Sequence, residues 1–267
     1  MLGASGFLGN SLYKELRTFF DVHGTYFTKS RFSKNQKFQH LDLEREMLAP
    51  ILWNLRPDII ISALHGNFNA QVDVHREIED YLLRTPSKLI FLSSSNVFDA
   101  FTNFPSFEYD KTLSDSVYGR MKIKIENALL RLPPEKYIIA RLPMIFGTNS
   151  PRIREIKQLV ELQEPIDIFP NVVINANSVQ KFTQQIHYLI NQNKSGIFHL
   201  GSTDLVHHSE LIEDICERIN VTNPIFRRNY SSNEDRFLAV LPKDQKLPKN
   251  MQISIAEVIA DCSLKGC

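Results

Sequence analysis

The sequence predicts an α/β protein built on a doubly wound parallel sheet, followed by a smaller C-terminal part. Three observations predict this fold: a glycine-rich turn at the start of the chain, apolar runs that alternate with amphipathic stretches, and two nearly continuous apolar runs at 58–64 and 88–93. Parallel neighbours need a crossover connection, so strands and helices alternate. Strands covered on both faces are apolar throughout. We therefore expect helices on both faces of the sheet.

The first half supplies most of this sheet. The turn at 3–9 (GASGFLG) leads into a helix whose apolar positions recur every three to four residues. Such a turn normally follows a strand of about five or six residues, yet only Met1 and Leu2 precede it. We expect the first strand to be nearly absent, or the chain to begin inside a longer sequence. Further elements are expected as strands at 22–27, 38–41, 58–64, 88–93 and 137–142 and a helix at 116–132.

The alternation loosens after residue 150. We expect helices at 151–163, 178–191 and 209–219 and extended segments at 166–174 and 196–200. This change predicts a first domain over 1–150 and a smaller substrate-binding part over 151–267. Residues 170–192 are expected to pack back on the first domain.

Composition excludes several function classes. The 31 Lys and Arg residues nearly balance 30 Asp and Glu, so no nucleic-acid partner is expected. Cys216, Cys262 and Cys267 are few and widely spaced, which argues against a disulfide scaffold or a zinc site. No metal site is predicted, because the adjacent His207 and His208 point apart. No apolar run approaches the roughly 20 residues that span a bilayer, and no signal peptide is recognised. We expect a soluble, cytoplasmic protein without a membrane partner.

The glycine turn indicates a phosphate site. Gly3, Gly6 and Gly9 permit a tight turn and a close approach of the backbone to a pyrophosphate at the positive end of the helix. A plain strand-to-helix turn is the alternative.

A tyrosine and a lysine share one helix face. Tyr118 and Lys122 lie four residues apart, about one turn along the helix expected at 116–132. A neighbouring ammonium favours the phenolate, so Lys122 is expected to lower the pKa of Tyr118 toward the working pH of a general acid. The alternative is a solvated helix face.

Serines close a buried strand. Residues 93–99 (SSSNVFD) follow the apolar run that ends near residue 93. Ligands of parallel sheets bind outside the carboxyl ends of the strands, where the hydroxyl of Ser94 could stabilise charge on a substrate oxygen. A capped turn is the alternative.

Together these motifs resemble the extended short-chain dehydrogenase/reductase family. The glycine turn, the serine and Tyr-x-x-x-Lys occur in that order, with Ser94 and Tyr118 24 residues apart (118 − 94). Residues 91–99, 140–147 and 196–200 resemble its dTDP-4-dehydrorhamnose reductase branch, which binds sugar nucleotides. The resemblance implies a Rossmann-type sheet that binds NAD(P) over 1–150.

The resemblance also implies roles for individual residues. Tyr118 would protonate the substrate carbonyl, Lys122 would bind the nicotinamide ribose and Ser94 would polarise the carbonyl. The implied cofactor contacts are Gly3, Ser5, Gly6, Phe7 and Leu8 at the pyrophosphate, Asp42 and Leu43 at the adenine, Ala63, Leu64 and His65 at the ribose, and Pro143 at the carboxamide. The substrate contacts are expected at Ser94, Asn96, Val97, Asn175 and Arg236.

Charge at the end of the second strand indicates the cofactor. An NAD site usually ends that strand with an acid that binds the ribose 2′-hydroxyl, whereas residues 28–31 read Thr-Lys-Ser-Arg. Lys29 and Arg31 suit a 2′-phosphate, so NADP(H) is favoured over NAD(H). The alternative is that both are ordinary loop charges.

The resemblance thus implies an NADP(H)-dependent reductase of a keto group on a nucleotide-linked sugar, and it allows a homodimer. Two departures from the branch support an alternative, a non-catalytic protein that binds NAD(P) or a sugar nucleotide. Residues 62–64 (SAL) replace its usual Asn-Ala-Ala, and the segment down to Lys88 is short. Epimerisation and dehydration are disfavoured, because Ser95 and Asn96 stand where dehydratases carry an acidic pair.

Overall fold

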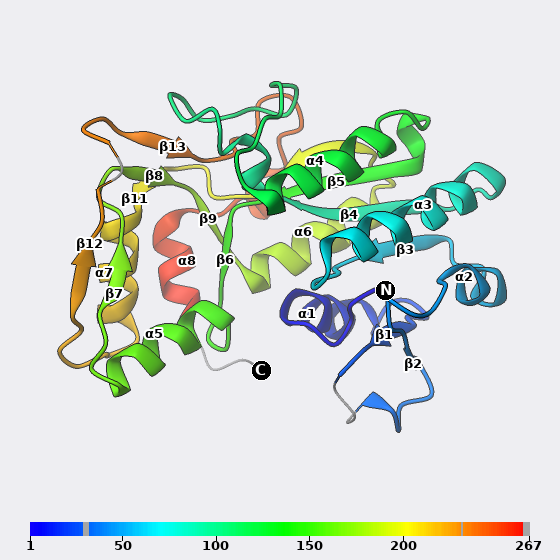
Figure 1. The fold of residues 1–267 in the computed structure, drawn as a ribbon, viewed down its shortest axis with the longest axis horizontal. Coiled ribbons are helices and arrows are strands. Elements are labelled where there is room, and N and C mark those ends of the chain that lie inside the picture. The colour runs from blue at the N-terminus through cyan, green and yellow to red at the C-terminus, as the bar shows by residue number, and fades with distance from the viewer. Residues whose placement is uncertain (29–31, 231, 264–267) are drawn as a thin grey trace.

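Four parallel strands form the main sheet in a computed structural model, which describes residues 1–28, 32–230 and 232–263 (Figure 1). Their order across the sheet is β10-β5-β4-β3. The strands span β3 Ile59–Ser62, β4 Lys88–Ser94, β5 Tyr137–Leu142 and β10 Gly196–His199. The predicted parallel α/β architecture is therefore confirmed.

Before the glycine turn, Leu2 forms a single parallel bridge with Ser62 at the end of β3. The Leu2 amide donates to the Ile61 carbonyl at 2.8 Å, and the Ala63 amide donates to the Leu2 carbonyl at 3.0 Å. On the other side, the Thr25 amide donates to the Met1 carbonyl at 2.9 Å. Two residues thereby join the main sheet to the parallel pair of β1 (Gly24–Tyr26) and β2 (Phe38–His40).

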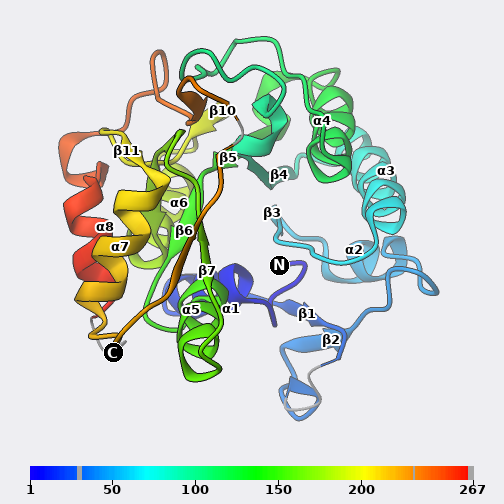
Figure 2. The ribbon, with the colours of Figure 1, turned by 60° about the vertical axis from the view of Figure 1, so that its left-hand side comes forward.

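Helices cover both faces of the main sheet (Figure 2). On one face, Phe91 and Ile139 pack against α2 (Ala49–Leu55), α3 (Phe68–Arg84) and α4 (Val117–Leu129). On the other face, Ile90 and Ile138 pack against α1 (Phe7–Leu16) and α6 (Val179–Asn191). Successive side chains of a strand point to opposite faces, which is why apolar runs predict these strands.

The remaining elements form a second part with its own apolar core, which includes Phe146, Ile168, Ile215 and Val258. Its helices are α5 Pro151–Glu161, α7 His208–Arg218 and α8 Ile255–Asp261. Its strands are β6 Met144–Phe146, β7 Ile166–Ile168, β8 Val172–Ile174, β9 Ala176–Ser178, β11 Val206–His207, β12 Phe226–Arg228 and β13 Arg236–Leu238.

Strand β10 belongs to the main sheet and not to the second part, where the sequence analysis placed it. The segment at 196–200 is expected in the substrate-binding part, but β10 pairs in parallel with β5 and extends the main sheet. Helix α6, which precedes it, packs against α1 through the core that contains Phe182, Ile186 and Leu189. Strand order is set by pairing across the sheet, which a local pattern does not encode. Among the helices of the described chain, none has the length and hydropathy to cross a membrane.

A buried histidine predicts loss of stability in acid. Burial lowers the pKa of His75 from 6.5 to about 4, so between these pH values the unfolded chain binds a proton that the folded chain rejects. The free energy of unfolding should therefore fall as the pH drops from 6.5 to 4, by about 3 kcal/mol for this group. We expect His75→Gln to flatten that pH dependence in urea melts. A slope in His75→Gln equal to that of the parent would contradict this prediction.

Candidate active site

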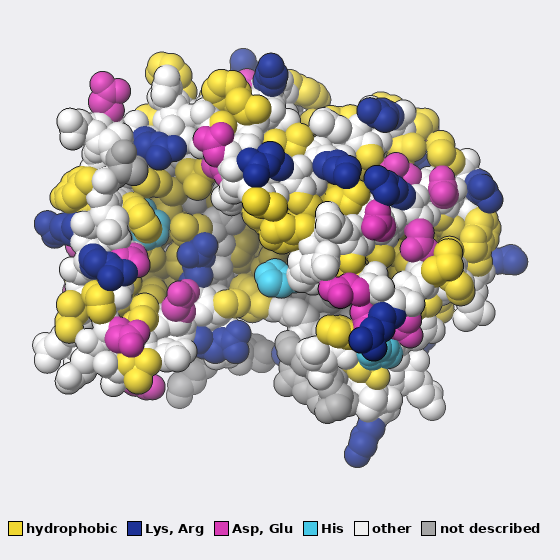
Figure 3. Space-filling model, viewed as in Figure 1, with side chains coloured by type: hydrophobic (Ala, Val, Ile, Leu, Met, Phe, Trp, Pro, Cys, Tyr) yellow, Lys and Arg dark blue, Asp and Glu magenta, His cyan; other side chains and the backbone are white. Residues whose placement is uncertain are grey.

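A cleft of about 870 Å³ lies at the carboxyl ends of the main strands, between the sheet and the second part. The face in Figure 3 is hollowed between these two halves of the molecule. Residues of the glycine turn, of β4 and of α4 line one side, and residues at the start of α5 and around β8 line the other. This is the edge at which ligands of parallel sheets bind.

The glycine turn leaves the start of α1 open to the cleft. Gly3 has φ of +71°, and a Cβ there would lie 2.5 Å from the Ala63 carbonyl oxygen. Gly6 is the N-cap and provides no side-chain cap, so the first amides of α1 are left without the acceptor that a capping side chain would give. Gly6, Phe7 and Leu8 line the cleft. Uncapped amides at the positive end of a helix suit a phosphate group.

The tyrosine, the lysine and the serine meet in this cleft. Tyr118 and Lys122 lie one turn apart on α4, and Ser94 ends β4. The Ser94 hydroxyl donates to Asn96 Oδ1 at 2.9 Å and accepts the Asn96 amide at 3.2 Å. The hydroxyl thus has a fixed position at the helix start that follows β4. It also interacts with the Tyr118 side chain.

Contrary to expectation, Lys122 does not lower the pKa of Tyr118. Burial raises the pKa of Tyr118, and only the interaction with Ser94 opposes this rise. The Lys122 ammonium lies 5.6 Å from the centre of the Tyr118 ring and donates instead to the Leu92 carbonyl at 2.9 Å. Helix spacing places the two side chains on one face, but it does not report how deeply each is buried.

The Lys122 side chain is charged at neutral pH, although burial lowers its pKa. It is 4% exposed, and burial lowers its pKa from 10.5 to about 8. The Glu126 carboxylate, one turn further along α4, opposes that lowering. At neutral pH the ammonium form therefore prevails, as a partner for hydroxyls or for a phenolate requires.

A buried ion pair fixes α4 against the sheet. Arg141 of β5 and Glu126 of α4 are 2% and 1% exposed, and Arg141 Nη2 donates to Glu126 Oε2 at 2.7 Å. The Ser93 hydroxyl donates to the same carboxylate at 2.5 Å, and Arg141 Nη1 donates to the Glu108 carbonyl at 2.8 Å. These bonds link the helix that carries Tyr118 to two strands and one loop. Sequence reasoning missed this pair, whose partners lie 15 residues apart on different elements.

Most of the predicted site residues line the cleft. They are Gly6, Phe7, Leu8, Ala63, Leu64, His65, Ser94, Asn96, Tyr118, Lys122, Pro143 and Asn175. Gly3 and Ser5 lie in the turn beneath it. Lys29 and Arg31 lie outside the described residues.

Four predicted residues are not among those that line the cleft. Val97 is expected at the substrate, but it is fully buried in a small core with Phe98 and Val240. Arg236 donates through Nε to Thr102 Oγ1 at 3.1 Å. Asp42 and Leu43 follow β2, where Asp42 accepts the Glu44 amide and Leu43 packs on the main core.

Asn175 reaches the cleft, but its amide group is engaged elsewhere. Its Nδ2 donates to the Val240 carbonyl at 2.8 Å, and its Oδ1 accepts the Val240 amide at 3.1 Å. The side chain is fully buried. Asn175 therefore ties β8 to the segment after β13, and we correct the expectation that its amide contacts substrate.

Comparison with known proteins identifies the family. Residues 1–256 match the family described as the RmlD substrate binding domain. The chain belongs to this family. A relative, the dTDP-4-keto-6-deoxy-D-glucose reductase of Streptomyces niveus, is 31% identical over 113 residues, which cover 42% of this chain and 39% of the relative. The match thus spans about two fifths of that protein.

Solved structures share the fold of this RmlD family member. A dTDP-4-dehydrorhamnose reductase from Bacillus anthracis in complex with NADP is 18% identical with a TM-score of 0.76, covering 97% of this chain and 95% of that one. A hypothetical dTDP-4-dehydrorhamnose reductase from Sulfolobus tokodaii is 21% identical with a TM-score of 0.75, covering 90% of both chains. These similarities show that the chain shares the fold of these structures.

The sequence analysis did not predict two charged residues that line the cleft of this RmlD family member. Arg152 and Glu155, on the first turns of α5, line the cleft opposite Tyr118. Burial lowers the pKa of Arg152, and Glu155 opposes that effect. Ser150 caps α5 and Pro151 begins it, so the sequence marks the helix start. The sequence carries no signal that the start of α5 faces the main sheet.

The glycine turn yields a matched pair of variants. Gly3 and Gly196 both have positive φ, +71° and +98°, but of the two only Gly3 has other backbone atoms within 4 Å of the place that a Cβ would take. We expect Gly3→Ala to lower the free energy of unfolding by about 3 kcal/mol, since strain and a clash add, and Gly196→Ala by about 1 kcal/mol. Urea denaturation of both variants measures this difference. Equal losses would contradict the close packing of Gly3 on Ala63.

Proposed function

We propose that this chain is an NAD(P)(H)-dependent reductase of a keto group on a nucleotide-linked sugar. One observation carries the proposal: Ser94, Tyr118 and Lys122 line the same cleft into which the uncapped start of α1 opens. A proton donor and a phosphate-binding turn at one strand edge are what such a reduction needs. The family membership and the reductase from Streptomyces niveus support the same reaction class.

The fit of a dinucleotide rests on the turn. Gly6 lines the cleft, and the place that a Cβ would take there has only the Gly3 carbonyl oxygen near it, so Gly6 and the uncapped amides of α1 leave room for a pyrophosphate beside the backbone. Gly6, Phe7 and Leu8 would hold the pyrophosphate, and Lys122 would bind the ribose hydroxyls. When bound, a reduced nicotinamide supplies the hydride that reaches the carbonyl carbon.

The protein supplies the proton and the placement. Tyr118 would give its phenolic proton to the carbonyl oxygen, so that the C=O group becomes CH–OH. Ser94 would donate a hydrogen bond to that oxygen, and the Lys122 ammonium would stabilise the phenolate that remains. Arg152, on the opposite wall, is placed to meet a diphosphate of the substrate.

Titration with NADPH and NADH tests the cofactor assignment. The preference for NADP(H) rests on Lys29 and Arg31. We expect the Lys29→Ala/Arg31→Ala variant to weaken NADPH binding at least tenfold and to leave NADH binding nearly unchanged. Loss of both affinities in equal measure would contradict a 2′-phosphate site at these residues.

A non-catalytic binding protein is the competing proposal. The raised pKa of Tyr118 favours it, because burial holds that pKa above the range that suits a general acid near neutral pH. Binding of both NADPH and a keto-sugar nucleotide without oxidation of NADPH would support this alternative.

A further inference from the structure

The loop between β4 and α4 lies along the segment that contains and follows β13 (Figure 1). The Ser106 amide donates to the Ala239 carbonyl at 2.9 Å, and the Leu241 amide donates to the Ser106 carbonyl at 3.0 Å. Leu238, at the end of β13, lines the cleft. The loop that leads into the helix of Tyr118 is therefore paired with a wall of the cleft.

The carboxylate of Glu108, in the same loop, is fully buried and bound by a turn of the backbone. The Lys243 amide donates to its Oε2 at 2.9 Å, and the Gln245 amide donates to its Oε1 at 3.1 Å. The Asp244 amide donates to Oε2 at 3.4 Å. Three successive amides thus surround one carboxylate, an arrangement that suits an anion. A buried charge needs donors of this kind.

The charge of Glu108 is what holds this turn. Burial acts to raise the pKa of Glu108, but the amide bonds, with that of Lys243 first, outweigh burial and hold the pKa below its usual range. The carboxylate form therefore prevails at neutral pH. In Glu108→Gln the side chain keeps its size, but an NH2 group replaces one acceptor oxygen. At least one amide of the turn at 243–245 would then lose its acceptor.

The same residue is joined to α4 through Arg141. The Glu108 carbonyl accepts Arg141 Nη1 at 2.8 Å, and Arg141 pairs with Glu126 of α4. His199, at the end of β10, makes a second link. Its Nδ1 donates to the Leu241 carbonyl at 3.0 Å, and its Nε2 lies 3.3 Å from Arg141 Nη1. A continuous set of bonds therefore joins the turn at 243–245 to α4.

We propose that Glu108 is a positioning residue for the nucleotide-linked sugar, an inference that rests on the proposed function. It fixes the wall at Leu238 relative to α4, so that the keto carbon meets Tyr118 while the second part binds the rest of the substrate. Val240 lies between Leu238 and the turn and bonds to Asn175, so a shift of the turn would reach two residues that line the cleft. The glycine turn lines the other side of the cleft, and cofactor affinity should not depend on Glu108.

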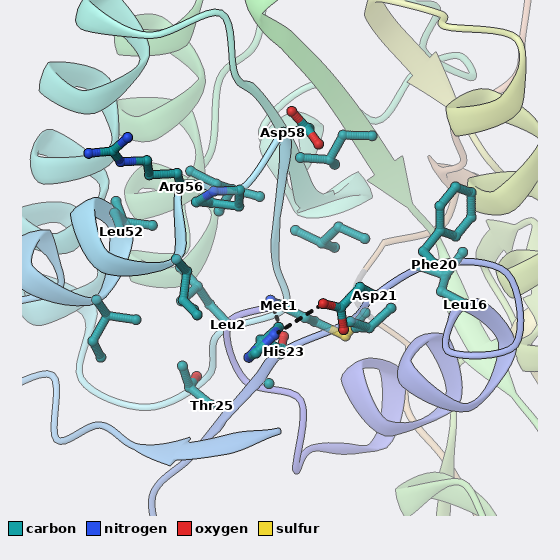
Figure 4. A pocket seen from close by; sticks show the side chains of 18 of the residues that line it. Met1, Leu2, Leu16, Phe20, Asp21, His23, Thr25, Leu52, Arg56 and Asp58 are labelled. Atoms are coloured by element: carbon teal, nitrogen blue, oxygen red, sulfur yellow. Dashed lines mark hydrogen bonds and ion pairs between the residues drawn. The ribbon is translucent and has the colours of Figure 1, made fainter. Parts of the chain in front are cut away.

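Amide hydrogen exchange tests the hold on the turn without catalysis. We expect Glu108→Gln to speed exchange at the Lys243 and Gln245 amides about tenfold, with the Ile90 amide inside the main sheet as slow as in the parent. The matched control is Asp58→Asn. Asp58 is an exposed carboxylate that lines a cavity of about 360 Å³ beside the start of β3 (Figure 4), and its variant should leave the turn unchanged. Unchanged exchange at Lys243 and Gln245 in Glu108→Gln would overturn the proposal.

Kinetics separate positioning from a purely structural role. In Glu108→Gln the KM for a keto-sugar nucleotide should rise about tenfold, with a smaller change in kcat and with the parent Kd for NADPH. Faster exchange in the turn with an unchanged KM would overturn the proposal. If Glu108→Gln does not fold, His199→Phe carries the same expectation for KM, because it keeps a ring against Phe98 and removes the bond to Leu241.

Failure of the proposed reductase gives a different result. A parent chain that binds the keto-sugar nucleotide without oxidising NADPH would contradict the reductase alone, and the tenfold loss in Glu108→Gln is then expected in the Kd of that nucleotide. An equal Kd in parent and variant would overturn the positioning role. A parent chain that binds no keto-sugar nucleotide would overturn both proposals.

Discussion

Replacing Tyr118 by phenylalanine should lower kcat about a thousandfold, because a positioned general acid contributes roughly 10²- to 10⁴-fold. The ring remains, with its contact to Phe68 at 6.0 Å between centroids, so the cleft keeps its shape. NADPH affinity should therefore change little. Steady-state rates of NADPH oxidation with a keto-sugar nucleotide measure the effect.

The control for Tyr118→Phe is Tyr109→Phe. Tyr109 is 68% exposed and lies outside the residues that line the cleft. This variant should keep the parent rate. If Tyr118→Phe retained more than about a tenth of the parent kcat, a different proton donor would be required.

Breaking the buried ion pair should have the largest effect on stability. Arg141→Met leaves the Glu126 carboxylate buried with Ser93 as its remaining hydrogen-bond donor among the described residues. Removing one partner of a buried pair costs about 3–5 kcal/mol, because the other charge is left uncompensated. We expect that loss in the free energy of unfolding, measured with urea.

A double variant separates the unpaired charge from lost packing. Arg141→Met combined with Glu126→Leu removes both charges and fills similar volume, so it should recover most of the loss. If the double variant were less stable than Arg141→Met alone, the cost would lie in packing or in the bonds to Glu108. The Arg141–Glu126 pair would then not be the feature that holds α4.

Burial on both faces made much of the fold predictable. The runs that form β3, β4 and β5 are apolar because helices cover each side of the sheet. Helix α4 begins where Ser116 accepts the Gly119 amide, within the range expected from the sequence. Helix α3 is absent from the sequence-based prediction, although Val74, Ile78 and Leu82 recur at helical spacing and are buried.

The site was predictable where helix geometry or a turn defines it. Tyr118 and Lys122 share a face because of their spacing, and Gly3 is required by a close backbone contact. Val97 could have been excluded, since an apolar residue after a buried strand more often enters the core. Arg152 depends on how the second part meets the sheet. The packing of the second part against the sheet is tertiary structure, and the sequence around Arg152 carries no local signal of it.

A single-turnover measurement tests the central claim most directly. The chain is mixed with one equivalent of NADPH and an excess of a keto-sugar nucleotide, and both the nicotinamide and the sugar product are followed. The account predicts one sugar hydroxyl formed for each NADPH oxidised, with the reaction lost in Tyr118→Phe. Binding of both ligands with no oxidation of NADPH would contradict it.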